Sequence, residues 1–109
     1  MIRPLAATLF LLSALAAPAR ADIPGNTITI GVLTDMNAGN ADATGQGSVV
    51  AAQLAVEDAQ KFLPGVKIDV INADHQNKAD VAASVSREWV SKGVNVIADV
   101  PFSSAGLAV

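Results

Sequence analysis

The order of apolar segments along the chain constrains its fold more than any other feature of the sequence. Short segments typical of β-strands alternate with longer amphipathic segments typical of helices. The predicted strands are 27–33, 66–72 and 94–100; the predicted helices are 47–63, about 78–92 and the start of a third at 103–109. Such alternation is typical of parallel βαβ units with helices on the faces of the sheet. The sequence therefore predicts a three-layer α/β fold, βαβαβα, around a parallel sheet.

The two complete predicted helices each carry an apolar stripe with a spacing of three and four residues. In the first helix the stripe consists of Val49, Ala52, Val56, Ala59 and Leu63. In the second, Val81, Val85 and Trp89 recur in the same way, which places Trp89 in the core rather than against a ligand. The Pro64-Gly65 pair ends the first helix, and Asn77 is the predicted N-cap of the second.

Residues 1–21 have the three-part pattern of a secretory signal peptide. Arg3 gives a positive start, the apolar run 5–17 follows, and Ala19 and Ala21 have the spacing of a cleavage site. The apolar run is shorter than the roughly 20 residues that a membrane-spanning helix needs, which favours cleavage over an uncleaved anchor. Because the chain has no cysteine, bacterial lipid attachment at this point is impossible. We expect an exported, soluble product that begins at Asp22.

The composition of the chain excludes several classes of function. With Lys+Arg 7 against Asp+Glu 10 and a pI near 4.7, no nucleic-acid partner is expected. The absence of cysteine excludes a disulfide scaffold, a cysteine zinc site and a thiol nucleophile. Residues 22–109 suffice for one small core. Three strands and an unfinished helix nevertheless make an incomplete domain, so we expect a fragment of a longer chain.

Three predicted loops follow the strands, and in a parallel sheet such loops meet at the carboxyl edge, where ligands bind. They span 34–47, 73–78 and 101–104. Asp35 and Asp99 end two strands and could bind Mg²⁺ together; the alternative is that one caps a turn and the other is solvated. His75 is the only histidine, and a single loop histidine is usually solvated or hydrogen-bonded. With no second histidine or cysteine nearby, no metal site is predicted.

The glycines of the first loop do not form a nucleotide-binding motif. Gly45-Gln46-Gly47 is followed by Val50 where G-x-G-x-x-G needs its last small residue, and it begins well past the strand. The chain also has no G-K-[ST], so no cofactor is predicted. The predicted helix start at Gln46–Val49 nevertheless presents free backbone amides that suit an anion.

Ser104 lies between a strand and a helix, as the nucleophile of an α/β-hydrolase does. Phe102 stands where the G-x-S-x-G elbow needs glycine, and His75 precedes the serine rather than following it, so no enzyme is predicted. The hydroxyls of Ser103 and Ser104, with amides at the helix start, are predicted instead to hold a carboxylate, with plain N-capping as the alternative. Phe102 is either a hydrophobic plug or a binding platform.

Four segments of the chain form an ordered set. They are ITIGVLTDM (28–36), GQG (45–47) with AAQLAVED (51–58), DVINADHQNKAD (69–80) and GVNVIADVP (93–101). Together they resemble the periplasmic solute-binding proteins of ABC importers, in the type I group related to leucine/isoleucine/valine-binding protein. The resemblance implies two α/β lobes that close on a small solute. Residues 22–109 would be the N-terminal part of the first lobe, and the second lobe is absent from this chain.

The same resemblance implies a periplasmic component that delivers a small carboxylate, either an amino acid or an aromatic or organic acid, to an ABC permease in the inner membrane. In the family, the loop after the third strand binds the ligand carboxylate, which carries over to Ser103 and Ser104 with Phe102 beside them. The loop after the first strand, from Asp35 to Gln46, would lie at the cleft mouth. The Pro101-Phe102 pair departs from the hydroxyl-rich stretch of amino-acid binders, which weighs against a branched-chain amino acid.

Two other interpretations stay open from the residues alone. An exported enzyme on a flavodoxin-like sheet would use Asp35, Asp99 or Ser104 and would need a downstream histidine or acid. A ligand-sensing ectodomain would need a transmembrane span, and a truncated remnant would have lost the function of its ancestor.

Overall fold

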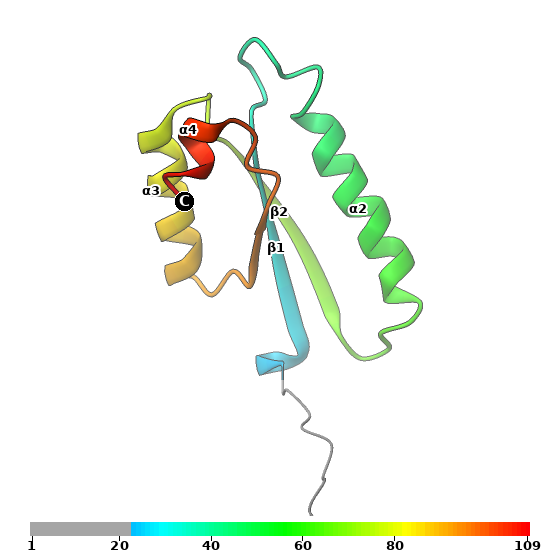
Figure 1. The fold of residues 1–109 in the computed structure, drawn as a ribbon. Coiled ribbons are helices and arrows are strands. Elements are labelled where there is room, and N and C mark those ends of the chain that lie inside the picture. Colours follow the sequence, from blue (N-terminus) through cyan, green and yellow to red (C-terminus); the bar gives the residue numbers. More distant parts are fainter. Residues whose placement is uncertain (1–22) are drawn as a thin grey trace, which may run out of the picture.

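The computed structural model describes residues 23–109, in which the predicted alternation of parallel strands and helices is confirmed (Figure 1). In chain order the elements are η2 (Pro24–Asn26), β1 (Thr27–Thr34), α2 (Gln46–Gln60), β2 (Lys67–Asp74), α3 (Ala79–Ser91), β3 (Val96–Ala98) and α4 (Ser103–Gly106). The predicted signal peptide, residues 1–21, lies outside the described residues. Within residues 23–109, no helix combines the length and the apolarity that crossing a bilayer requires.

β1 is the central strand of a three-stranded sheet with the order β2-β1-β3. It pairs with β2 along its whole length, from Thr27 opposite Lys67 to Thr34 opposite Asp74. Its pairing with β3 is shorter and runs from Ile30 to Val32. Both pairings are parallel, so the carboxyl ends of the three strands lie at one edge of the sheet.

The helices cover the two faces of the sheet separately. Figure 1 shows α2 on one side of the strands and α3 with α4 on the other. This arrangement follows from the strand order, because the chain crosses from β1 outward to β2 and then back past β1 to β3. Each crossover therefore carries its helix to a different face. The result is the three-layer α/β architecture that the sequence predicts.

The main hydrophobic core lies between the sheet and the α3–α4 layer. Its buried members are Leu33, Ala82, Trp89 and Ala105. Trp89 is 8% exposed, which confirms that this residue belongs to the core. Its indole ring lies directly on Gly31 of β1: a Cβ built on Gly31 would come within 2.4 Å of Trp89 Cζ3. The absent side chain at Gly31 thus provides the space that the ring occupies.

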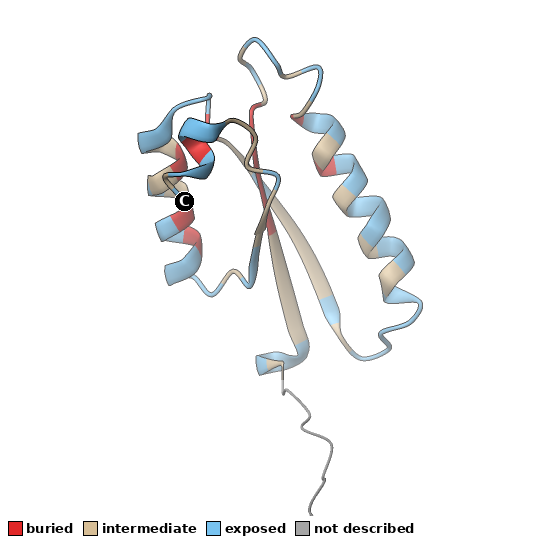
Figure 2. Cartoon of the chain, in the orientation of Figure 1, coloured by how far each residue is buried: buried red, intermediate tan, exposed pale blue. Residues whose placement is uncertain are grey.

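The opposite face is covered less completely. On the predicted stripe of α2, Val49 is 1% exposed and Val56 is half-buried, while Leu54 on the outer side is 57% exposed. Figure 2 shows most of α2 exposed or intermediate, in contrast to the buried inner face of α3. The stripe is confirmed from Val49 to Ala59 but not at Leu63, which is 41% exposed and lies beyond α2, since the helix ends at Gln60. Gln60 Nε2 donates to the carbonyl oxygens of Leu63 and Val66, which turns the chain toward β2.

Further boundaries differ from the prediction. β2 begins at Lys67 and continues to Asp74, whereas the predicted strand spans 66–72. β3 has only three residues: it begins at Val96 rather than at residue 94, and it ends at Ala98 because Asp99 adopts a positive φ of 54° and leaves the extended conformation.

The N-cap of α3 is Lys78, and its side chain makes no capping bond. Asn77, the predicted cap, has a φ of 52° and instead donates its backbone N–H to His75 Nδ1. The prediction of an Asn77 cap is therefore wrong.

Candidate functional site

The loops that follow β1, β2 and β3 meet at the carboxyl edge of the sheet, at the top of the view in Figure 1. Four non-glycine residues at this edge have a positive φ, with values from 52° to 73°: Gln76, Asn77, Asp99 and Phe102. Such backbone conformations are costly and persist only where surrounding contacts fix them. Strain of this kind gathers at functional sites, which makes this edge the place to examine.

Asp74, the last residue of β2, joins the first two loops. Its Oδ1 accepts hydrogen bonds from the backbone N–H of Met36 at 3.1 Å and of Gln76 at 2.8 Å. Its Oδ2 accepts a bond from Asn37 Nδ2 at 2.8 Å. Partial burial raises the pKa of Asp74, but these hydrogen bonds and the nearby His75 outweigh that effect, so the pKa lies below its usual value of 3.8. Asp74 also lines a shallow polar hollow with Asn37, Ala38, Gln76 and Lys78.

The first loop is fixed to the end of β1 at Gly45. The backbone N–H of Gly45 donates to Thr34 Oγ1 at 2.9 Å, and Thr44 Oγ1 donates to the carbonyl oxygen of Asp35 at 3.2 Å. Gly45 has a φ of +64°, and a Cβ there would lie 2.8 Å from the carbonyl oxygens of Asp35 and Ala41. Only glycine satisfies both constraints. This closure sets where α2 begins.

Asp35 and His75 are both fully buried at this edge. Asp35 Oδ1 accepts a bond from the backbone N–H of Ala38 at 2.9 Å, so Asp35 caps a turn. The backbone N–H of His75 donates to the Thr34 carbonyl at 2.8 Å and extends the β1–β2 ladder. Two side-chain atoms, Asp35 Oδ2 and His75 Nε2, are buried without a partner among the described residues. A solvated His75 is thus excluded, while the predicted hydrogen bonding is present at Nδ1.

The third loop contributes Phe102, whose ring is partly buried against His75. The two ring centroids lie 6.1 Å apart at an interplanar angle of 89°, an edge-to-face contact. Ser103 and Ser104 begin α4 and are exposed. The N-cap position of α4 is occupied by Phe102, so neither serine is the N-cap of this helix, as the alternative interpretation would require.

The two aspartates of the acidic pair have different surroundings in the described part of the chain. Asp99 is exposed while Asp35 is buried and caps a turn, as the alternative interpretation expects. Among residues 23–109, no three histidine, cysteine, aspartate or glutamate side chains come close enough to hold a metal ion.

Gln46 lies apart from the other candidate residues. It is exposed at the start of α2, on the opposite face of the sheet from α4 (Figure 1). The predicted set of free amides at this helix start is also smaller than expected, since the N–H groups of Ser48 and Val49 both donate to the Gly45 carbonyl. The structure therefore brings Phe102 next to His75 at the sheet edge, with the two serines following, but it does not bring Gln46 to them.

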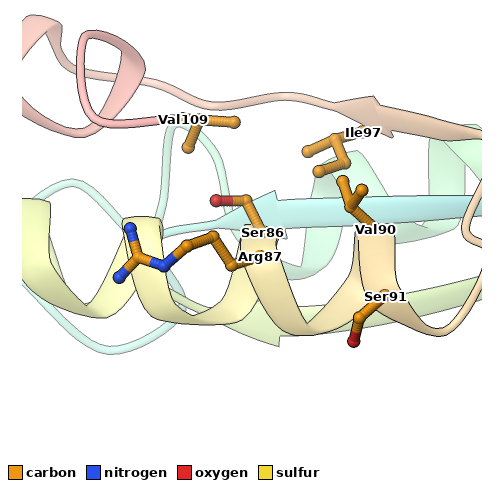
Figure 3. Close-up of a pocket in the computed structure, with 6 residues that line it drawn as sticks. All are labelled: Ser86, Arg87, Val90, Ser91, Ile97 and Val109. Carbon is orange, nitrogen blue, oxygen red and sulfur yellow. The ribbon is translucent and has the colours of Figure 1, made fainter.

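A second hollow lies between α3 and β3, and it is mostly apolar (Figure 3). Its lining residues are Ser86, Arg87, Val90, Ser91, Ile97 and Val109. Both serine hydroxyls donate within their own helix, Ser86 to the Ala82 carbonyl at 2.8 Å and Ser91 to the Glu88 carbonyl at 2.7 Å. Apart from the exposed Arg87, the lining of this hollow thus offers a small polar solute few free hydrogen-bonding groups, whereas polar side chains gather at the carboxyl edge, which is the better candidate.

Sequence reasoning missed one residue and one contact of this edge. Asp74 ends a parallel strand just as Asp35 and Asp99 follow theirs, so its position was a usable signal. The contact between His75 and Phe102 joins two separate loops, and no local pattern predicts it.

Comparison with known proteins gives a consistent picture. A family model described as "Periplasmic binding protein" matches residues 27–109. A periplasmic binding protein from Burkholderia mallei is 40% identical over 77% of this chain and 23% of its own, with a TM-score of 0.71. A branched chain amino acid ABC transporter periplasmic ligand-binding protein from Burkholderia xenovorans is 48% identical over 74% of this chain and 22% of its own, with a TM-score of 0.69.

A third structure carries a ligand. It is the solute binding protein of an ABC transporter from Rhodopseudomonas palustris in complex with 3,4-dihydroxy benzoic acid, 29% identical over 76% of this chain and 23% of its own, with a TM-score of 0.63. A search among curated protein sequences finds no significant match. The chain thus spans less than a quarter of the length of the solved proteins that it matches.

Proposed function

This chain belongs to the periplasmic binding protein family, and from that premise we propose that residues 22–109 form the N-terminal part of the first lobe of a solute-binding protein for an ABC importer. Residues 1–21 would direct export to the periplasm as a cleaved signal peptide. A second lobe would close over the carboxyl edge of the sheet, and an inner-membrane ABC permease would receive the solute. The family consists of binding proteins, and the role proposed here involves no catalysis.

We infer that the solute is a small carboxylate. The observation that carries this inference is the pair of exposed serines, Ser103 and Ser104, directly after the partly buried ring of Phe102. Neither hydroxyl is bonded to another group in residues 23–109, so both are available as donors to a carboxylate. Phe102 would pack against the apolar body of the solute.

The identity of the residue before the serines supports one kind of carboxylate over another. An aromatic ring at Phe102 fits a flat, apolar body, so we favour an aromatic or other organic acid over a branched-chain amino acid. The Rhodopseudomonas relative, solved in complex with 3,4-dihydroxy benzoic acid, supports this choice. Asp35 and Gln46 would border the cleft from the first loop and from the start of α2.

The experiment that tests this proposal is a calorimetric titration of the intact gene product with benzoate, hydroxybenzoates and leucine. We expect Ser103→Ala and Ser104→Ala each to weaken carboxylate binding by about 10- to 100-fold, because a hydrogen bond to a charged group contributes roughly 1.5–3 kcal/mol. Ser84→Ala, an exposed serine in the middle of α3, serves as the matched control and should bind as the wild type does. Unchanged affinity in both loop variants would refute the assignment of the serines.

A further inference from the structure

We propose that His75 and Asp35 form a second polar subsite of the same cleft, which binds a hydroxyl group of the solute. The proposal rests on the proposed function, since it adds a specificity-determining pair to the carboxylate site. It would make the preferred solute a hydroxylated carboxylate rather than a plain one.

The sheet register places the two residues side by side at the end of the sheet. Thr34 is the last residue of β1 that pairs with β2, and its partner is Asp74. Asp35 and His75 are the residues that follow this pair on the two strands. Leu33 and Ala73, one pair earlier, both pack in the core on the α3–α4 side. Because side chains alternate along a strand, this alternation continued one residue past each strand would return Asp35 and His75 to that same side.

The hydrogen bonds of His75 fix where its proton is. Its Nδ1 accepts the backbone N–H of Asn77 at 3.0 Å, so in the neutral ring Nδ1 carries no proton and Nε2 carries it. Nε2 is therefore a donor, and it is buried with no acceptor among residues 23–109. Asp35 presents the complement: Oδ1 is occupied by Ala38 N–H, and Oδ2 is buried with no donor.

This donor and this acceptor select one chemical group. A hydroxyl can accept from Nε2–H with its oxygen and donate its own proton to Asp35 Oδ2. A second carboxylate would be repelled by Asp35, and an ammonium group could not accept from the imidazole. Buried polar atoms without partners are rare in folded proteins, so each one needs an explanation, and a hydroxyl of the solute is the one proposed for this pair.

Phe102 lies between this pair and the serines. Its ring contacts the His75 imidazole edge-to-face, and its backbone has a φ of +73°, which is strained for a bulky residue. A solute whose carboxylate binds Ser103 and Ser104 would extend past this ring toward His75. Because both members of the pair are fully buried, the hydroxyl can reach them only if a group that covers them moves aside, and the Phe102 ring, which contacts His75, is the group proposed here.

The test is a thermodynamic cycle between a ligand hydroxyl and His75. The intact gene product is titrated with benzoate and with the three monohydroxybenzoates, in the wild type, in His75→Phe and in Asp35→Asn. We expect one hydroxybenzoate to bind the wild type at least tenfold more tightly than benzoate, and this preference to fall to about twofold or less in both variants. Benzoate is the reference ligand in each protein, so any effect of a substitution on carboxylate binding itself cancels in the ratio of the two affinities.

Three results decide the matter. A hydroxyl preference that survives in both variants, or a wild type with no hydroxyl preference, overturns the subsite while leaving carboxylate binding intact. A wild type that binds none of these carboxylates overturns the proposed function and the subsite with it. If the variants do not fold, the imidazole ¹⁵N resonances of the wild type give the answer. Nε2 of His75 should shift on addition of the preferred hydroxybenzoate and stay unchanged with benzoate; identical spectra would refute the contact.

Discussion

Asp74 is a single carboxylate that holds two loops of the candidate site in place. It accepts three hydrogen bonds, from Met36, Asn37 and Gln76, and its pKa in the folded chain lies below 3.8. A group with a lowered folded pKa stabilises the fold fully above its unfolded pKa and loses that contribution as the pH falls through the folded value. The ordered loops at the carboxyl edge should therefore be sensitive to acid.

We predict that Asp74→Asn removes part of this acid sensitivity. At neutral pH the variant should be about 1 kcal/mol less stable, because an amide nitrogen cannot accept the bond from Asn37. Below about pH 4 the difference from the wild type should shrink, since the wild-type carboxylate becomes protonated there. Thermal denaturation followed by circular dichroism between pH 2.5 and 7 measures this. Asp42→Asn, in the exposed part of the first loop, is the control. A difference in stability between the wild type and Asp74→Asn that stays constant with pH would contradict the role assigned to Asp74.

At the scale of elements, the packing of α3 on β1 depends on one missing side chain. Trp89 occupies the space above Gly31, and a Cβ at that position would lie 2.4 Å and 2.5 Å from two atoms of the indole. A ring wedged between a central strand and a helix cannot shift without moving the helix. The distance between these two layers is therefore set by the contact between Gly31 and Trp89.

We predict that Gly31→Ala destabilises the fold by about 1–3 kcal/mol, the usual cost of overpacking a well-filled core. Gly47→Ala is the matched control, because Gly47 lies in α2 and a Cβ there meets nothing within 4 Å. That substitution should be neutral or stabilise by up to about 1 kcal/mol. Urea denaturation of the two variants and the wild type gives both values. Equal stability of Gly31→Ala and the wild type would show that the helix can move away freely.

The sequence predicts some features of this fold better than others: the order of the elements is predicted well, and the ends of elements and the contacts between loops are not. The order of the elements and the core positions of Val49 and Trp89 follow from local periodicity, which every turn of helix or pair of strand residues repeats. The end of α2 and the length of β3 do not, because a Gln60 side chain and a positive φ at Asp99 decide them. The contact between the buried His75 and Phe102 was the hardest feature to predict from the sequence, since only the sheet register brings these loops together.

For the whole molecule, the decisive feature is that β1 has a partner strand on each side while β2 has β1 alone in the described sheet. β1 is also covered by helices on both faces, and from Gly31 to Thr34 it is buried. Opening of the sheet should therefore begin elsewhere and reach the carboxyl half of β1 last.

We predict that the amides of Gly31–Leu33 exchange with deuterium at least about 100-fold more slowly than those of η2 and of the amino half of β2, because only global unfolding exposes them. Hydrogen exchange on the intact gene product, read by NMR or by mass spectrometry of peptides, measures this order. Equal protection along β1 and β2 would show that the two strands open as one unit.

The position of Trp89 has a practical consequence. It is the only tryptophan of the chain, and it shares its core cluster with Ala105, which directly follows the two proposed solute-binding serines. Any displacement of Phe102 or α4 on solute entry would be passed to the indole through Ala105. The chain therefore carries an intrinsic optical reporter, whose emission wavelength can follow occupancy of the neighbouring cleft in real time without a label.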